Sequence, residues 1–153
     1  MAIAVKNSVT ANLLNSLNEI RISGGHENDA AADGQRVRGN SPDDRDILLI
    51  DNGDTFVDDS PVNADDYNAS YTVKCFVAVS DVDASQPYPP ELVQLVAEVR
   101  QRLNEDYTRG AFAINTITGA DSPMATDERA GYAGRSLDVT VHYRTAKNDP
   151  TSL

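Results

Sequence analysis

The sequence contains a single cysteine, Cys75, and lacks any long hydrophobic run. One cysteine excludes an internal disulfide and any metal cluster built from several thiolates. No apolar run approaches the roughly 20 residues that cross a bilayer, and the first residues lack the basic-then-apolar pattern of a secretory signal, so we expect no membrane partner. At 153 residues, the chain is long enough for a stable core and is expected to form one domain over residues 1–153.

Positive charge is also scarce. The chain has 13 Lys and Arg against 24 Asp and Glu, a net charge of −11. Binding nucleic acid through a basic face is therefore not expected, because neutralising phosphates needs clustered cations. Only three of the bases are Lys, and 18 of the acids are Asp. Because molar salt shortens the Debye length to about 3 Å, we interpret this composition as adaptation to high salt; an ordinary acidic protein is the alternative.

Two segments are predicted to be helices. Residues 8–22 carry Leu13, Leu14 and Leu17 at helical spacing, with Ser8 or Thr10 expected to cap the start. Residues 90–107 show a stronger amphipathic pattern, with apolar residues on one face and charged residues on the other.

Short segments with apolar residues predict the strands. Two runs, 47–50 and 55–57, flank Asn52-Gly53, a dipeptide typical of a tight hairpin turn. Alternation predicts strands at 71–79 and 137–143, and a weaker pattern predicts one at 112–116. In the last strand, the residues expected to point inward are Leu137, Val139, Val141 and Tyr143.

Polar segments at about 24–46, 58–70 and 118–135 are predicted to be long loops; the first two are acidic, and the first and third contain glycine. The element order predicts an α+β fold, in which both amphipathic helices pack on one face of an antiparallel sheet. The other face of the last strand is polar, as expected when one side of an antiparallel sheet meets solvent.

Motifs for chemistry are scarce in this chain. Cys75 lies on the apolar alternation of a strand, which favours a buried structural thiol over a nucleophile. His26 and His142 lack a third ligand at zinc spacing. The acids of Asp51-Asn-Gly-Asp54 do not follow the calcium-loop pattern, and a hairpin turn explains them. We therefore expect no catalytic residue, no metal site and no cofactor; a small metal-dependent hydrolase using Asp51 or Asp54 remains one alternative.

The layout resembles the tail-terminator and tail-completion (neck) proteins of long-tailed viruses. The matching parts are the helix near the N-terminus, the strand at 71–79, the helix from Glu91 to Arg100 and, most closely, the ending Leu137-Asp-Val-Thr-Val-His-Tyr-Arg-Thr-Ala-Lys-Asn-Asp-Pro150. Its form Val-x-Val-x-Tyr-Arg, followed by a polar stretch and Asp-Pro, is a recurring feature of such proteins. The acidic composition would suit a virus of haloarchaea.

The resemblance implies a structural virion protein rather than an enzyme. Such proteins form a hexameric ring that caps the tail tube and joins it to the head connector, so the implied partners are copies of this chain, the tail tube protein and the connector proteins. Viral DNA would only pass through the bore, and the implied location is the neck or tail of a virion assembled in the host cytoplasm. Another head-to-tail connector or assembly protein, or an acidic mimic of DNA, is the alternative.

Under this interpretation the candidate site residues are interfacial. Arg144 is predicted to form bidentate pairs with carboxylates of a neighbouring copy, and Arg100, Arg102 and Arg109 are predicted to lie on or near the outer face of the second helix. The alternative for each is a solvated charge.

Acidic residues of the predicted loop 58–70 are the candidates for the bore, where carboxylates would repel phosphate. They are Asp58, Asp59, Asp65 and Asp66. The alternative is that this loop faces solvent on the outside of the ring.

Overall fold

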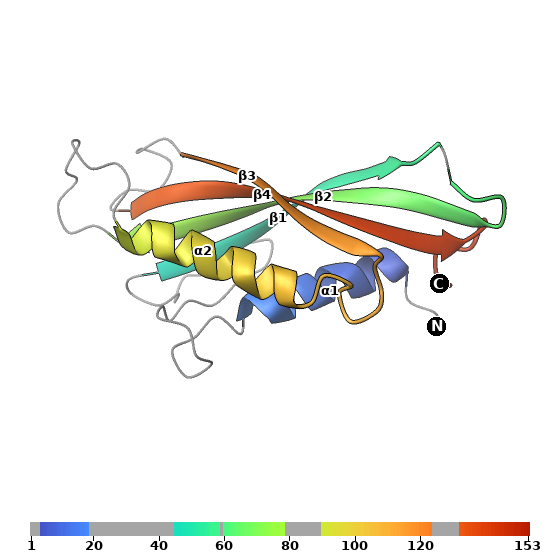
Figure 1. Ribbon diagram of the computed structural model, residues 1–153, viewed down its shortest axis with the longest axis horizontal. Helices are drawn as coiled ribbons and strands as arrows, with labels where there is room; N and C mark the ends of the chain where they lie inside the picture. The colour runs from blue at the N-terminus through green and yellow to red at the C-terminus, as the bar shows by residue number, and fades with distance from the viewer. Residues whose placement is uncertain (1–3, 19–44, 59, 79–89, 124–131) are drawn as a thin grey trace.

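The computed structural model describes residues 4–18, 45–58, 60–78, 90–123 and 132–153. Their elements are, in order, α1 (Val5–Asn18), β1 (Arg45–Phe56), β2 (Ala64–Ala78), α2 (Pro90–Glu105), β3 (Asn115–Pro123) and β4 (Tyr132–Ala146). The strands form one sheet in the order β1-β2-β4-β3, and every neighbouring pair is antiparallel. Both helices lie on the same face of this twisted sheet (Figure 1), so the predicted α+β architecture is confirmed.

The centre of the sheet is a long pair of strands. β2 and β4 have 15 residues each and stay in register from Ala64 opposite Ala146 to Ala78 opposite Tyr132. The predicted alternation in the last strand is confirmed, because its four expected inward residues are all buried. The core forms where these residues and the inward side chains of β1 and β2 meet the apolar faces of the helices.

Helix α1 begins three residues earlier than predicted, at Val5. Its buried apolar residues follow a spacing of four: Val5, Val9, Leu13 and Leu17. Ser8 and Thr10 lie within the helix and do not cap its start. The Val5 N–H instead donates to the carbonyl of Pro150 (2.9 Å), which joins the first turn of the helix to the end of the chain. The predicted end, residues 19–22, lies outside the described residues.

Helix α2 spans Pro90–Glu105 and agrees with the predicted range of 90–107 to within two residues. Its buried residues are Leu92, Leu95, Val96, Val99 and Leu103, together with Glu98. Packing of this apolar stripe supplies most of the stability of such a helix.

The predicted hairpin turn at Asn52-Gly53 is wrong. β1 runs through these residues as one strand and pairs with β2 along its length, and the register shifts by one residue between Asp51 and Gly53. Gly53 has a φ of 99°, so the dipeptide forms a β-bulge, which needs the same backbone freedom as a tight turn. The bulge reverses the alternation, and both Asp51 and Asp54 therefore point to the helix-covered face.

A second bulge interrupts β3, the other edge strand. Thr118 pairs with Val139, but the next pair joins Asp121 to Leu137, so β3 contains one extra residue. As in β1, the shift turns an aspartate toward the helix-covered face. Because bulges at sheet edges disturb regular pairing with other strands, the regular part of the β3 edge is confined to Asn115–Thr118.

The predicted loop 58–70 is largely wrong, because β2 begins at Ala64. Asp65 and Asp66 belong to this strand and are buried. They are tolerated there because each has a partner: Arg144 of β4 pairs with Asp66, and the N–H of Asn148, just after β4, donates to Asp65. Asp58 is exposed in a turn, and Asp59 lies outside the described residues.

Two other predicted loops are shorter than expected. In the segment 118–135, β3 continues to Pro123 and β4 starts at Tyr132; residues 124–131 lie outside the described residues. In the segment 24–46, residues 45–46 belong to β1 and the rest lies outside them. The strand predicted at 112–116 starts later, at Asn115, because the positive φ angles of Arg109, Gly110 and Ala111 keep the preceding residues in turns.

Candidate functional site

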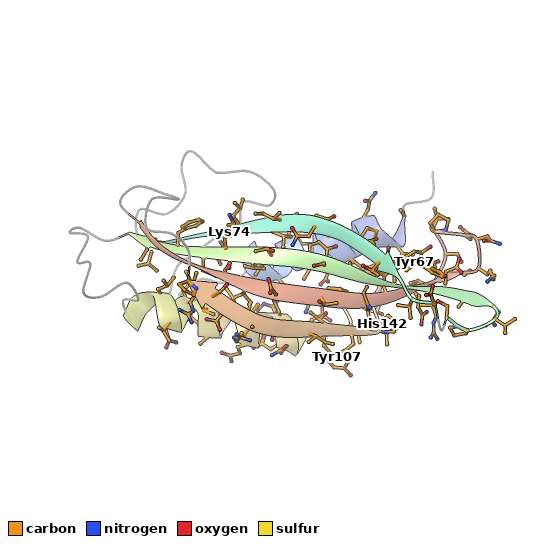
Figure 2. The ribbon with its side chains drawn as sticks, turned by 90° about the horizontal axis from the view of Figure 1, so that it is seen from above. Tyr67, Lys74, Tyr107 and His142 are labelled. Carbon is orange, nitrogen blue, oxygen red and sulfur yellow. The ribbon has the colours of Figure 1, made fainter. Side chains whose placement is uncertain are left out.

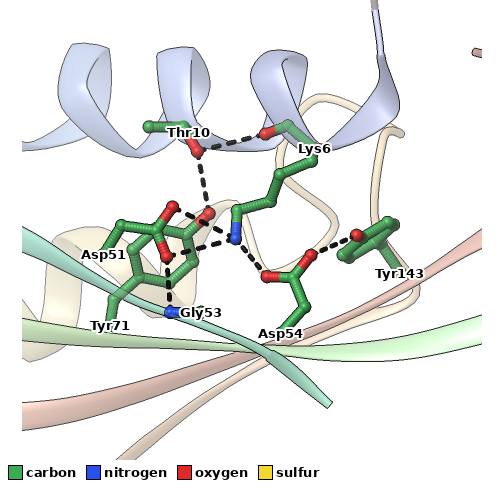
Figure 3. A network of polar contacts seen from close by, with 7 residues as sticks. All are labelled: Lys6, Thr10, Asp51, Gly53, Asp54, Tyr71 and Tyr143. Carbon is green, nitrogen blue, oxygen red and sulfur yellow. Dashed lines mark hydrogen bonds and ion pairs between the residues drawn. The ribbon is translucent and has the colours of Figure 1, made fainter. Parts of the chain in front are cut away.

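A polar cluster joins α1 to the bulge of β1 (Figure 3). The Lys6 ammonium lies between Asp51, at 3.2 Å, and Asp54, with which it forms a close ion pair. The same ammonium lies 5.0 Å from the centre of the Tyr71 ring. The Tyr143 hydroxyl donates to the second oxygen of Asp54 at 2.5 Å. Burial disfavours the charged lysine, but the two carboxylates outweigh it and raise the pKa of Lys6.

A similar cluster joins α2 to the bulge of β3. Arg100 donates to the Gly119 carbonyl (2.8 Å) and to Asp121 (2.7 Å), and Arg135 of β4 forms a close ion pair with the same carboxylate. These bonds, from Arg135 first and then Arg100, hold the pKa of Asp121 below its usual range. Arg100, predicted to be an interface residue, therefore attaches its own helix to the sheet.

Arg144 also pairs within its own chain. It forms a bidentate pair with Asp66 on the face of the sheet that the helices leave uncovered, at 2.6 and 3.0 Å. His142, which lies on the same face (Figure 2), has its Nε2 3.3 Å from Asp66, without hydrogen-bond geometry. The Arg144 guanidinium lowers the pKa of the Asp66 carboxyl. The carboxylate that was predicted to come from a neighbouring copy thus comes from β2.

The other two predicted arginines differ from each other. Arg102 forms an ion pair with Glu105 at 3.1 Å within α2. Arg109 is fully buried, so its predicted position on an outer face is wrong. Its guanidinium donates to Ser16 of α1 at 3.2 Å and closely to the Leu103 carbonyl at the end of α2. Burial lowers the pKa of Arg109, and this cation lies where the α2 dipole favours positive charge.

Metal-ligating side chains do not gather in the described part of the chain. No three His, Cys, Asp or Glu side chains there are placed to hold a metal ion. Cys75 is buried, as predicted, and burial raises the pKa of its thiol to about 12, which keeps it in the unreactive protonated form. A small cleft of about 380 Å³ lies beside Arg100, Asp121 and Arg135, with an apolar wall from α2.

The most unusual exposed surface was not predicted. It comprises four apolar side chains around the start of β3: Tyr107 (55% exposed), Phe112 (37%), Ile114 (41%) and Ile117 (55%). We call these residues the β3 edge patch. Thr116 donates to the Tyr107 carbonyl at 2.8 Å and so holds this residue beside the strand, and Tyr107 projects past the edge of the sheet (Figure 2). Residues 107–120 contain no carboxylate, which is the signal that could have indicated this surface.

The charge clusters predict how stability depends on pH. The pKa values of Asp66, Asp106 and Asp121 are lowered in the folded protein; for Asp106 the main cause is the N–H of Gly110. Carboxylates with a lowered pKa contribute stability above their unfolded pKa of about 3.9 and lose it as the pH falls through the folded value.

We therefore expect the free energy of unfolding, measured by urea titration at pH 2–7, to fall steeply below about pH 4. The variant Asp66→Asn should be less stable at pH 7 and show a shallower decline, whereas Asp58→Asn should keep the wild-type profile. An unchanged slope in Asp66→Asn would contradict the assignment.

Comparison of the whole sequence with protein-family models finds no match, and comparison with curated proteins finds none that is significant. Within the described residues, no helix is both long and apolar enough to cross a membrane.

Proposed function

We propose that this chain is a structural subunit of a virion neck or tail, which forms a ring, with six copies expected, that terminates the tail tube and joins it to the head connector. One observation carries the proposal. The sheet has two edges, β1 and β3, and strict antiparallel order makes these edge strands run in opposite directions. Copies in the same orientation can therefore join β3 to β1 as antiparallel neighbours, which is the head-to-tail contact from which rings are built.

The sequence ending that resembles neck proteins supports the proposal through its role in the fold. Within Val-x-Val-x-Tyr-Arg, the two valines are buried, Tyr143 donates to Asp54 of β1, and Arg144 pairs with Asp66 of β2. The following Asp-Pro brings the Pro150 carbonyl to the start of α1. The residues of this pattern thus connect β4 to β1, β2 and α1. A sequence that shares the pattern is therefore expected to share this fold.

The surface for the bore is better assigned to the uncovered face of the sheet than to an acidic loop, since Asp65 and Asp66 are buried in β2. Outward positions at the centre of this face carry mostly hydroxyl and amide groups. They include Asn68, Ser70 and Thr72 of β2 and Thr140 of β4. Because such neutral groups release no counterions from DNA, they would bind passing phosphates weakly.

Electron microscopy of the purified protein tests this proposal. In 2 M KCl, where repulsion between copies is screened, negatively stained samples should show a six-fold annulus, and sedimentation should give the matching mass. At 50 mM KCl the annulus should dissociate, because a charge of −11 per copy opposes assembly. A protein that stays monomeric at both salt concentrations, and that does not bind purified tail tubes, would refute the proposal.

A further inference from the structure

The β3 edge patch has the composition expected of a contact between acidic proteins. Its four side chains are apolar, and the sequence from residue 107 to 120 contains a single charged residue, Arg109, which is buried. Elsewhere the chain carries 24 carboxylates. Two copies with a net charge of −11 repel each other less where one of the two surfaces lacks carboxylates, and this stretch combines that property with exposed apolar surface.

The backbone that carries the patch is held in a rare conformation. Arg109, Gly110 and Ala111 have φ angles of 50°, 68° and 72°, and such angles are unfavourable for residues other than glycine. The buried guanidinium of Arg109 and the bond from the Gly110 N–H to Asp106 (3.0 Å) maintain this geometry. The backbone between Tyr107 and Phe112 is therefore constrained before binding, which lowers the entropic cost of binding.

The patch lies beside the regular part of an open sheet edge. Ile114 donates to the His142 carbonyl at 2.7 Å, and among the described residues Asn115–Thr118 then pair with β4 on one side only. An open edge next to apolar side chains is suited to binding another strand, because backbone hydrogen bonds and side-chain burial then act together.

We propose that the β3 edge patch binds the β1 edge of a second copy of this chain. The inference rests on the proposed assembly into a ring and names the surface by which it forms. A second copy is the occupant favoured by charge, since this acid-free stretch adds no carboxylate of its own to a contact between two chains of −11. The β1 edge is favoured by direction, because β1 runs opposite to β3, and by its last residue, Phe56, which is apolar and exposed.

Aspartate substitutions test whether the β3 edge patch, and not another exposed surface, is the contact between copies. Ile117→Asp and Tyr107→Asp should weaken self-association in 2 M KCl at least about 100-fold by sedimentation, since each places a carboxylate at the centre of an apolar contact. Val93→Asp is the matched control, because Val93 of α2 is equally exposed (54%) but lies outside the patch; it should assemble as wild type does. Thermal melts should show that all three variants are folded.

The outcomes for the two proposals differ. Wild-type assembly that survives Ile117→Asp and Tyr107→Asp would overturn the β3 edge patch as the contact and leave the proposed ring intact. A wild-type chain that never assembles would instead overturn the proposed function.

Cysteine cross-linking tests which edge of the second copy is bound. Ile117→Cys would be combined in turn with Leu48→Cys, Ile50→Cys and Thr55→Cys, three positions on the uncovered face of β1; Cys75 is buried and does not interfere. At least one combination should give a ladder of covalent oligomers under oxidation. Covalent dimers from Ile117→Cys alone, or no ladder from any combination, would overturn the assignment to β1.

Discussion

Replacing Arg109 with alanine is expected to lower the free energy of unfolding by about 3–5 kcal/mol, the largest effect of any single charged residue in this fold. The substitution leaves a cavity between the two helices and removes the donors that serve Ser16 and the Leu103 carbonyl. Urea unfolding at pH 7 would measure the change. Arg102→Ala, seven residues earlier and paired with the exposed Glu105, is the control and should lose less than about 1 kcal/mol.

Replacing Arg109 with methionine separates the contribution of packing to stability from the contribution of the charged, hydrogen-bonded group. Burial of the Arg109 guanidinium is itself costly, as its lowered pKa and its unbonded Nε indicate. Because an apolar side chain of similar volume avoids that cost, Arg109→Met should lose less than half as much stability as Arg109→Ala. Equal losses in the two variants would show that hydrogen bonds, and not packing, dominate at this position.

The second large effect is expected at Asp54, which should lose about 2–3 kcal/mol when replaced by alanine. This carboxylate binds both Lys6 of α1 and the Tyr143 hydroxyl of β4, and its removal leaves the Tyr143 hydroxyl without this acceptor and Lys6 with Asp51 as its remaining carboxylate. Asp58→Ala, in an exposed turn four residues later, should change stability by less than about 0.5 kcal/mol.

A double-mutant cycle with Tyr143→Phe isolates the second of these bonds. The coupling energy between Asp54→Ala and Tyr143→Phe should be about 1 kcal/mol, because the two residues are in direct contact. Additive losses would mean that the cluster acts only through Lys6.

The elements predicted correctly are those set by local periodicity. The apolar stripe of α2 and the alternation of β4 each follow from residues close together in sequence, and both are confirmed. The buried position of Cys75 followed from the same alternation in β2. These features depend on a repeating pattern of side chains, and a single sequence is enough to show such a pattern.

The errors have a different origin, since they concern contacts between distant residues. Asn52-Gly53 suits a hairpin turn and a bulge equally well, and only pairing with β2 decides between them. Asp65 and Asp66 are acidic and polar in sequence, and their burial depends on partners about 80 residues away. In the sequence, Arg109 looks like a solvated charge that follows the end of a helix. Its burial depends on packing against the other helix, where its guanidinium donates to Ser16.

The order of the sheet implies an internal symmetry. The chain consists of two consecutive units, α1-β1-β2 and α2-β3-β4, and the strand order β1-β2-β4-β3 is the one produced by a two-fold axis passing between β2 and β4. Each unit repeats the same device, a bulged outer strand whose aspartate binds a cation of the preceding helix. Six chains would then present twelve such units, and the two ends of the annulus would share the same order of helix and strands. The end that receives the tube would have to be distinguished from the end that receives the connector by side chains and by the unequal connections, because 26 residues separate α1 from β1 but only nine separate α2 from β3.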